Sequence, residues 1–315
     1  MSEKYETIVP SEPDAGERLQ WVSWLRSAAP YVHLHHGRTF VISFAGEVVA
    51  DRTLLNHLVM DVSLIASMGM RVVLVHGSRP QIEELMSLRK LEGQFYKGVR
   101  ITGPQELECV KEACGETRFD IEAAFSQGLP NTPMQHSRIK VVSGNFVTAR
   151  PMGIIDGVDY LHTGVVRKVD AESIQDLLSR GNIVLVSPTG FSPTGEAFNL
   201  TTEDVATAIA VAIHADKLIL SVGVDGVRIQ GEKQQDLTAQ QAQALIQNKQ
   251  VDDEDVYNLG YALRAIKGGV DRVHIVPYAM DGGILTELFT HDGVGTMIST
   301  ENMESLREAT IDDVA

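Results

Sequence analysis

Short apolar runs that end in a glycine or proline turn recur along the chain, and longer segments with helical periodicity separate them. TFVISFAG (39–46) and MRVVLVHG (70–77) are two such runs, and DRVHIVPY (271–278) is a third. Continuous apolar strands of this kind suit a parallel sheet that is covered on both faces. Strands that alternate with helices are joined by right-handed crossovers. We therefore predict an α/β fold, a three-layer α/β/α sandwich with a mainly parallel central sheet.

The segments between these strands fit the same alternation. An amphipathic helix is predicted over 17–30, where apolar residues recur at helical spacing and two tryptophans widen the apolar face. Residues 138–153 are predicted to form a hairpin-like pair of strands. Further helices are predicted over 52–69, 80–93, 104–127, 238–249 and 255–267, and a helix followed by a strand within each of 171–188, 202–222 and 283–299.

The composition excludes several classes of partner. The 315 residues carry a net charge of −15 without a block of lysines and arginines, so neither nucleic acid nor anionic membrane is expected as a partner. No apolar run reaches the roughly 18 residues of a membrane-spanning helix, and the polar N-terminus has no secretory signal pattern. Cys109 and Cys114 fit ordinary thiols in a reducing cytosol. We expect a cytoplasmic protein.

Three glycine turns follow predicted strands: FAGE (44–47), HGSR (76–79) and SPTG (187–190). In an open α/β sheet the ligand binds beyond the carboxyl ends of the strands, where such turns lie. Backbone N–H groups in a glycine turn before a helix can hold a phosphate or another anion. Glycine is also an ordinary turn residue, so each turn alone leaves both interpretations open.

Taken together, the order of these stretches resembles the amino acid kinase family, and N-acetylglutamate kinase in particular, over residues 39–298. The resemblance rests on FVISFAGEVV, VVLVHGSRPQIEELM, GVRIT, IVLVSPTG, FNLTTEDVATAIA, ADKLILSVGVDGV and DGVGTMI. It implies the amino acid kinase fold, with phosphate loops after the first two strands.

Both phosphate loops depart from the kinase pattern. The kinases carry Lys-x-Gly-Gly in the first loop and His-Gly-Gly-Gly in the second. Asn258 stands at the position of a second kinase lysine, and Glu203 stands nearest to an aspartate that organises the two lysines. The degenerate loop positions are Ser43, in place of lysine, with Ala45 and Gly46 in the first loop, and Gly77, Ser78 and Arg79 in the second.

Phosphoryl transfer depends on charge neutralisation, and the loss of one electrostatic donor typically costs about 10²–10³ in rate. We therefore expect no kinase activity and no catalytic residue. The alternative is that Arg79 or Lys267 supplies the missing charge and that the chain is an active acylamino acid or carbamate kinase.

Other stretches are similar to the N-terminal domain of the bacterial N-acetylglutamate synthase family, in which an amino acid kinase domain precedes a GNAT-type acetyltransferase domain. They are VHGSRPQI (75–82), YALRAIKGGVDRVHIV (261–276) and ELFTHDGVGTMI (287–298). LREATIDDVA (306–315) resembles the start of a GNAT domain, and the sequence stops there. The resemblance implies an N-terminal extension for oligomerisation at 1–38, a kinase-like domain at 39–299, and a linker with a truncated GNAT start at 300–315.

The resemblance also implies a function. A complete enzyme of this family transfers acetyl from acetyl-CoA to the α-amine of L-glutamate, the first step of arginine biosynthesis, and arginine inhibits it from the kinase-like domain. This chain would keep the arginine site without kinase or acetyltransferase activity. Acetyl-CoA would be a substrate of the missing domain, and no cofactor is expected here. A stand-alone arginine sensor is a further alternative.

By the same resemblance, arginine lies between the N-terminal helix and the last part of the domain. Glu287 can hold a guanidinium in fork geometry, and Lys217 can hold the ligand carboxylate. Each position also has an ordinary interpretation, as a half-buried histidine, a solvated lysine or a surface glutamate. The candidate residues are Lys217, His274, Glu287, Gly293, Gly295 and Tyr31.

Two further patterns involve polar residues. Arg100 in GVRIT and Asn199 in FNL match the kinase positions that hold N-acetylglutamate, which suggests a vestigial acid-binding pocket. The histidines of YVHLHHG (31–37) fit a metal tract, but their alternation in a strand-like segment favours a structural role, so no metal site is predicted.

The helix predicted over 17–30 is too apolar to stand alone in water. The resemblance implies interlaced N-terminal helices that link kinase-type dimers into a hexameric ring. The alternative is a helix that folds back on its own domain. Arginine bound beside this helix would alter the geometry of the ring, which supplies the two states that allostery requires.

Overall fold

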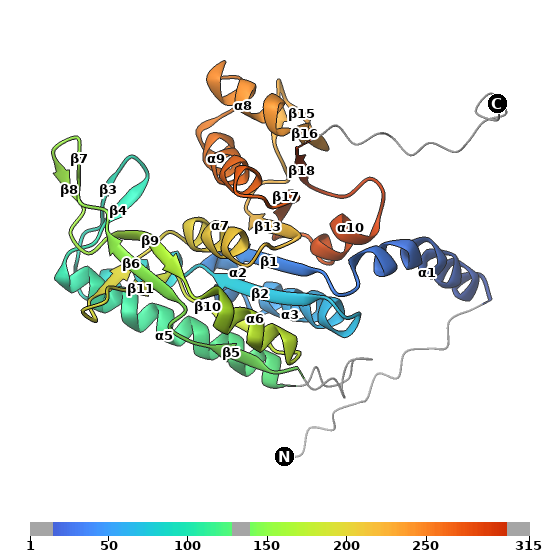
Figure 1. Ribbon diagram of the computed structural model, residues 1–315, viewed down its shortest axis with the longest axis horizontal. Helices are drawn as coiled ribbons and strands as arrows, with labels where there is room; N and C mark the ends of the chain where they lie inside the picture. Colours follow the sequence, from blue (N-terminus) through green and yellow to red (C-terminus); the bar gives the residue numbers. More distant parts are fainter. Residues whose placement is uncertain (1–14, 128–138, 301–315) are drawn as a thin grey trace, which may run out of the picture.

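One sheet of eight strands runs through the computed structural model, which describes residues 15–127 and 139–300 (Figure 1). Neighbouring strands are parallel, except that β17 and β18 are antiparallel. The predicted mainly parallel sheet is therefore confirmed. In spatial order the strands are β16 (Asp236–Thr238), β18 (Thr296–Ser299), β17 (Arg272–Pro277), β13 (Lys217–Val222), β1 (Thr39–Phe44), β2 (Arg71–His76), β10 (Ile183–Val186) and β5 (Val141–Ser143).

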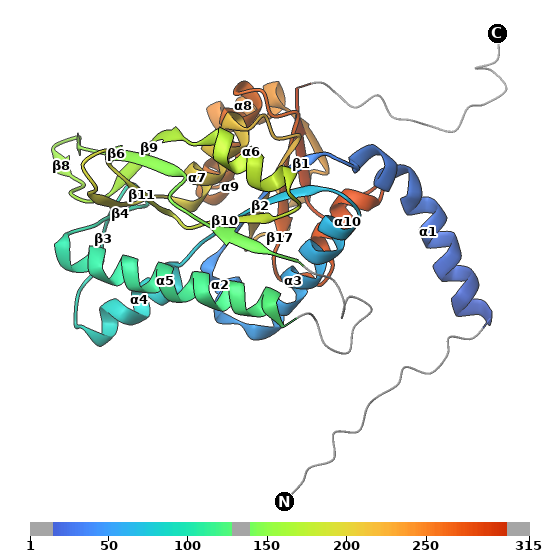
Figure 2. The ribbon, with the colours of Figure 1, turned by 60° about the horizontal axis from the view of Figure 1, so that its bottom comes forward.

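Alternate residues of the central strands enter two separate hydrophobic cores. In β1, Phe40 and Ile42 lie in the first core, whereas Val41 lies in the second. All of β1 is buried because helices cover both faces of the sheet (Figure 2). The three-layer sandwich is thus confirmed. The first face carries α3 (Arg52–Ser67), α5 (Pro104–Ser126) and α10 (Gly283–Phe289), and the second carries α6 (Ala171–Ser179), α7 (Thr202–Ala212), α8 (Ala239–Gln247) and α9 (Asp253–Lys267).

Smaller strands were missed by the sequence pattern. The hairpin predicted over 138–153 is wrong: β5 joins the central sheet beside β10, and β6 pairs with β9 and β11. The second sheet consists of β12 (Ala197–Asn199), β11 (Thr189–Phe191), β6 (Val147–Pro151) and β9 (Gly164–Val169). Three hairpins complete the structure: β3 (Gln94–Tyr96) with β4 (Val99–Ile101), β7 (Ile154–Ile155) with β8 (Val158–Asp159), and β14 (Arg228–Ile229) with β15 (Glu232–Lys233).

Helix α1 (Ala15–His35) projects from the rest of the molecule and meets α10 with its C-terminal part (Figures 1 and 2). Leu19, Trp24 and Leu25 are exposed on it. The helix continues through Pro30, so the strand-like segment predicted at 31–37 is wrong. None of the helices within the described ranges combines the length and apolar character needed to cross a membrane.

Candidate functional site

Two cavities lie at opposite ends of the strands of the central sheet. A pocket of about 690 Å³ lies at the amino ends of β1, β13 and β17, and Lys217 lines it. A cleft of about 620 Å³ lies at the carboxyl ends of β1, β2 and β13, and both degenerate loops line it. The two groups of residues that the sequence singled out are therefore separated by the length of the strands.

Lys217, His274 and Glu287 form one buried hydrogen-bonded chain. The Nζ of Lys217 donates to Nε2 of His274 at 3.1 Å, and Nδ1 of His274 donates to Oε1 of Glu287 at 2.7 Å. In the pairing of β13 with β17, Lys217 stands opposite Arg272 and Ile219 stands opposite His274. Because alternate residues of a strand share a face, the register brings the lysine and the histidine together.

The carboxylate of Glu287 is held from three directions. Its Oε2 accepts hydrogen bonds from the backbone N–H groups of Val294 at 2.8 Å and Gly295 at 2.9 Å, while Oε1 accepts from His274. Burial alone would raise the pKa of Glu287, but these hydrogen bonds hold it at about 2. The carboxylate is therefore ionised at neutral pH.

The pKa values of His274 and Lys217 are lowered as well, which for these two bases favours the neutral form. Burial and the neighbouring Lys217 lower the pKa of His274 to about 4, so its ring is neutral near pH 7. Burial and the guanidinium of Arg272 lower the pKa of Lys217 to about 7. The three hydrogen-bonded side chains are thus an ionised carboxylate (Glu287), a neutral imidazole (His274) and an amine (Lys217) that exchanges its proton near neutral pH.

Gly293 and Gly295 allow the loop after α10 to close over Glu287. A Cβ on Gly295 would collide with the carbonyl oxygen of Ile275, and a Cβ on Gly293 would collide with the Glu287 carboxylate. Gly293 also has a φ of +60°, in the left-handed region that favours glycine. The predicted residues 217, 274, 287, 293 and 295 therefore form one cluster.

Helix α1 reaches this cluster through His35, a histidine for which the sequence favoured a structural role. Tyr31 is half-buried and packs against the first core. His35, one turn later, is buried, lines the pocket and donates from Nε2 to the carbonyl of Leu288 at 3.0 Å. The four-residue spacing between the tyrosine and the histidine places both on one helix face, which is the signal that marks His35.

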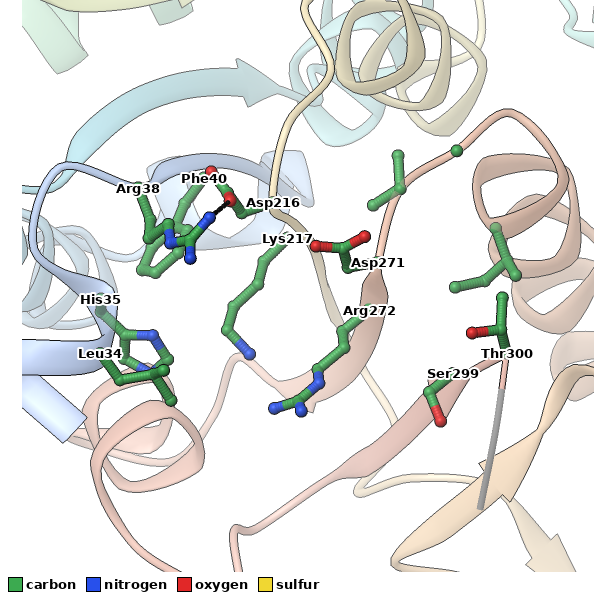
Figure 3. Close-up of a pocket in the computed structure, with 13 residues that line it drawn as sticks. Leu34, His35, Arg38, Phe40, Asp216, Lys217, Asp271, Arg272, Ser299 and Thr300 are labelled. Atoms are coloured by element: carbon green, nitrogen blue, oxygen red, sulfur yellow. Dashed lines mark hydrogen bonds and ion pairs between the residues drawn. The ribbon is translucent and has the colours of Figure 1, made fainter. Parts of the chain in front are cut away.

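Charges of both signs line the pocket (Figure 3). Arg38 donates to the carboxylate of Asp216 at 2.7 Å, so these two charges compensate each other. Lys217 and Arg272 both extend toward the middle of the pocket, and Asp271 directly precedes Arg272 in the chain. A concave site with a few convergent charges of both signs suits a small zwitterionic ligand.

The two degenerate loops lie side by side in the cleft. The N–H of Gly77 donates to the carbonyl of Phe44 at 2.7 Å. A Cβ on Gly77 would meet the backbone of Gly46, and a Cβ on Gly46 would meet Arg79 and its neighbours. Helices α2 (Gly46–Ala50) and α4 (Arg79–Leu88) begin here. The backbone of a strand–loop–helix phosphate site is therefore kept.

Among the described residues that line the cleft, the cations are Arg79 and Arg100, and both are engaged. Arg79 donates to Oε1 of Glu83 at 3.0 Å, and Arg100 donates to the same oxygen at 3.2 Å. Asn199 shares this cavity, and its Nδ2 donates to Oγ1 of Thr102 at 3.0 Å. The structure thus brings Arg100 and Asn199 to one cleft, but with their polar groups already bonded.

Polar residues without a positive charge occupy the two positions that the sequence resemblance matched to a kinase aspartate and a second kinase lysine. Glu203 accepts a hydrogen bond from the hydroxyl of Tyr257 at 3.1 Å, and burial raises its pKa. Asn258 is buried beside the cleft, and its Nδ2 has no hydrogen-bond partner among the described residues. Lys267 ends α9, about 14 Å along the helix axis from Asn258. That distance argues against Lys267 as a substitute cation.

Comparison with known sequences gives two consistent matches. The sequence profile of the amino acid kinase family matches residues 38–277. The amino-acid acetyltransferase of Ralstonia nicotianae is 55% identical over 303 residues, which are 96% of this chain and 67% of the relative. The amino-acid acetyltransferase of Ectopseudomonas mendocina is 48% identical over 295 residues, or 93% of this chain and 68% of the relative.

Solved structures agree with these matches. The N-acetylglutamate synthase of Neisseria gonorrhoeae, in a complex with coenzyme A and L-arginine, aligns with a TM-score of 0.83 at 35% identity, covering 93% of this chain and 68% of that chain. The carbamate kinase of Giardia lamblia bound to AMP-PNP aligns with a TM-score of 0.64 at 14% identity, over 84% of this chain and 99% of that chain, which shows a shared fold alone.

Proposed function

Because this chain belongs to the amino-acid acetyltransferases and has the amino acid kinase fold, we propose that it is the arginine-binding regulatory domain of an N-acetylglutamate synthase. It spans about two thirds of the length of its acetyltransferase relatives. The complete enzyme transfers acetyl from acetyl-CoA to the α-amine of L-glutamate, in the cytoplasm, for arginine biosynthesis. In this proposal acetyl-CoA is a substrate of the enzyme's other domain, and this chain uses no cofactor.

The observation that carries the proposal is the buried chain of Lys217, His274 and Glu287 beside a pocket with charges of both signs. L-Arginine carries a carboxylate, an ammonium and a guanidinium, so it needs charges of both signs in one site. A structural neighbour at 35% identity is complexed with L-arginine, which supports this ligand over other zwitterions.

In the proposed complex, Lys217 pairs with the ligand carboxylate and Glu287 receives the guanidinium in fork geometry. The backbone carbonyls of the loop that carries Gly293 and Gly295 receive the α-amine, and Tyr31 closes the site from α1. Because the Glu287 oxygens now accept from two loop amides and from His274, the guanidinium must displace the loop N–H groups. Arginine binding would therefore move the loop after α10.

The cleft at the other edge of the sheet supports the absence of phosphotransferase activity. Its two arginines are paired with Glu83, while Glu47, Asp253 and Glu254 add negative charge to the same cavity. A nucleotide triphosphate requires the opposite balance, because charge neutralisation dominates phosphoryl transfer. The Arg100 and Asn199 end of the cleft remains a proposed residual acid-binding pocket, which N-acetylglutamate tests.

The exposed apolar residues of α1 support assembly into a homo-oligomer. Leu19, Trp24 and Leu25 are between 45% and 72% exposed, far more than apolar side chains that a protein keeps in its own core. We propose that α1 helices interlace to join dimers into a hexamer. Arginine bound beside the C-terminal part of α1 would then alter the arrangement of the subunits, which is the proposed allosteric effect.

Titration calorimetry and thermal melts with L-arginine test the proposal. Arginine at about 100 times its dissociation constant should stabilise the fold by roughly 2.7 kcal/mol. Lys217→Met should abolish the binding heat, whereas Lys140→Met, at an exposed position, should leave it unchanged. ATP with Mg²⁺ should give neither heat nor stabilisation.

Two results would reverse this assignment. If ATP with Mg²⁺ binds and arginine does not, the chain is a kinase-like phosphotransferase. If arginine binds equally well to the Lys217→Met variant, the ligand occupies another site. Heat with N-acetylglutamate that is lost in Asn199→Ala would establish the residual acid-binding pocket, and no heat would end that part of the proposal.

A further inference from the structure

Two cations stand directly opposite each other in the pocket. Lys217 and Arg272 are paired residues of the parallel strands β13 and β17, so their side chains leave the same face of the sheet. Figure 3 shows both extending into the pocket that they line. Like charges directly opposite each other on neighbouring strands destabilise a sheet.

Neither cation has an anionic hydrogen-bond partner within the described residues. The hydrogen bond of Lys217 goes to the neutral ring of His274, and no hydrogen bond or ion pair joins the guanidinium of Arg272 to a carboxylate. The third cation of the pocket, Arg38, is by contrast paired with Asp216 at 2.7 Å. Both of these cations line a pocket of about 690 Å³, which is large enough to admit an anionic group.

We propose that Lys217 and Arg272 form a carboxylate-binding pair, and that Lys217 takes up a proton when a carboxylate binds there. The inference rests on the proposed function, since it assigns the carboxylate to L-arginine. It adds Arg272 as a residue that determines specificity, and it makes arginine binding dependent on pH.

The surroundings of Lys217 explain the proton uptake. Burial and Arg272 lower the pKa of Lys217 to about 7, against the weaker effects of the nearby carboxylates. A ligand carboxylate between the two cations favours the protonated amine and raises that pKa. The charged and titratable groups that face Lys217 are His35 from α1, Asp216 before β13, Asp271, Arg272 and His274 at β17, and Glu287 from α10.

Calorimetry in two buffers of different ionisation enthalpy, such as Tris and HEPES, measures the proton uptake. Each bound arginine should take up about 0.9 proton near pH 8 and about 0.1 near pH 6, because the free amine is mostly neutral only above pH 7. The affinity should fall about tenfold between these two pH values. Heats that do not depend on the buffer would overturn the proton uptake.

Agmatine, which is arginine without its carboxylate, distinguishes the contribution of the two cations to the affinity from that of the rest of the site. It should bind at least about tenfold more weakly than arginine and without proton uptake, since it lacks the carboxylate that would accept charge-assisted hydrogen bonds from the two cations. Equal affinity for agmatine and arginine would overturn the carboxylate pair.

Variants of Arg272 complete the test. Arg272→Gln should weaken arginine about tenfold and leave agmatine unchanged, and Arg272→Lys should restore part of the affinity. Arg167→Gln, at an exposed position on β9, is the control and should bind as the wild type does. If arginine binds without proton uptake and Arg272→Gln has no effect, this inference fails while the proposed function stands. If wild-type protein gives no heat with arginine at any pH, the proposed function itself fails.

Discussion

At the scale of single residues, the site depends on groups whose neighbours leave them little freedom. A Cβ on Gly295 would collide with the backbone of Ile275. Both carboxylate oxygens of Glu287 accept hydrogen bonds from other groups of the protein. Lys217 is buried beside a neutral histidine. Each of these positions can therefore be tested by a substitution that changes one physical property.

Gly295→Ala should destabilise the protein by about 1–3 kcal/mol, because its Cβ meets a backbone carbonyl that cannot rotate away. Thermal melts measure the effect. Gly260→Ala is the matched control, since Gly260 lies in α9 with open space around its Cβ position. Alanine there should be neutral or stabilise by about 0.5–1 kcal/mol. Equal melting points for the two variants would contradict the steric account of the loop.

The stability of the ligand-free protein should rise between about pH 7.5 and 8.5 in a way that depends on Lys217. The folded pKa of Lys217, about 7, lies below its unfolded value, so the unfolded chain binds more protons in this range. The free energy of unfolding of the wild type, minus that of Lys217→Met, should therefore increase by up to about 1.4 kcal/mol per pH unit. Denaturant unfolding at several pH values measures it, and parallel curves for the two proteins would rule it out.

Sequence reasoning at this scale found part of the cluster. The resemblance to a known family singled out Lys217, His274 and Glu287, and the structure brings them together. It did not single out Arg272, because its position opposite Lys217 depends on the pairing of β13 with β17 across 55 residues of chain. His35 was assigned a structural role and not a place in this pocket, because the alternation around it favoured a strand, whereas Tyr31 and His35 share the face of a helix.

At the scale of elements, α1 projects from the rest of the described structure. Its C-terminal part meets α10, and the side chains of Leu19, Trp24 and Leu25 are exposed further from the body. The apolar pattern predicted this helix correctly, but the pattern could not show where it ends. Pro30 lies inside the helix, and the contacts of His35 with Leu288 and the Phe40 ring hold the last turn in place.

Trp24→Asp combined with Leu25→Asp should reduce the proposed hexamer to dimers, because two charges cannot be buried in an apolar helix interface. Light scattering after gel filtration measures the change. Gln20→Asp combined with Ser23→Asp is the control with the same added charge on exposed polar positions of α1. A hexamer in the first variant would mean that another surface joins the subunits. Disruption by both variants would point to net charge rather than to the apolar face.

The long strands and helices were predictable, whereas the short strands were not. Central strands such as β1 and β2 are apolar throughout, and this pattern does not depend on their partners. The strands of the second sheet have three to six residues and pair with strands distant in sequence, as β6 does with β9 and β11. The local sequence does not indicate which distant strand each short strand pairs with. The prediction that residues 138–153 form a hairpin was wrong for this reason.

At the scale of the whole molecule, the kinase fold persists without the charges that its chemistry requires. The cleft keeps the loop backbone but pairs both arginines with Glu83. We therefore expect no more ADP than in a protein-free control when the chain is incubated with ATP, Mg²⁺ and N-acetylglutamate. Formation of ADP that is lost in Arg79→Gln or in Lys267→Gln would identify the substitute cation and contradict the loss of activity.

The two cavities lie at opposite ends of the same strands, roughly 20 Å apart for a strand of six residues. Selection can therefore act on them separately. Under the proposed function, substitutions in the loops of the cleft could accumulate without disturbing the proposed arginine site at the amino ends. The same separation gives protein engineers an independent test: a new catalytic site could be built at the carboxyl ends of the strands while the proposed arginine site at their amino ends is left unchanged.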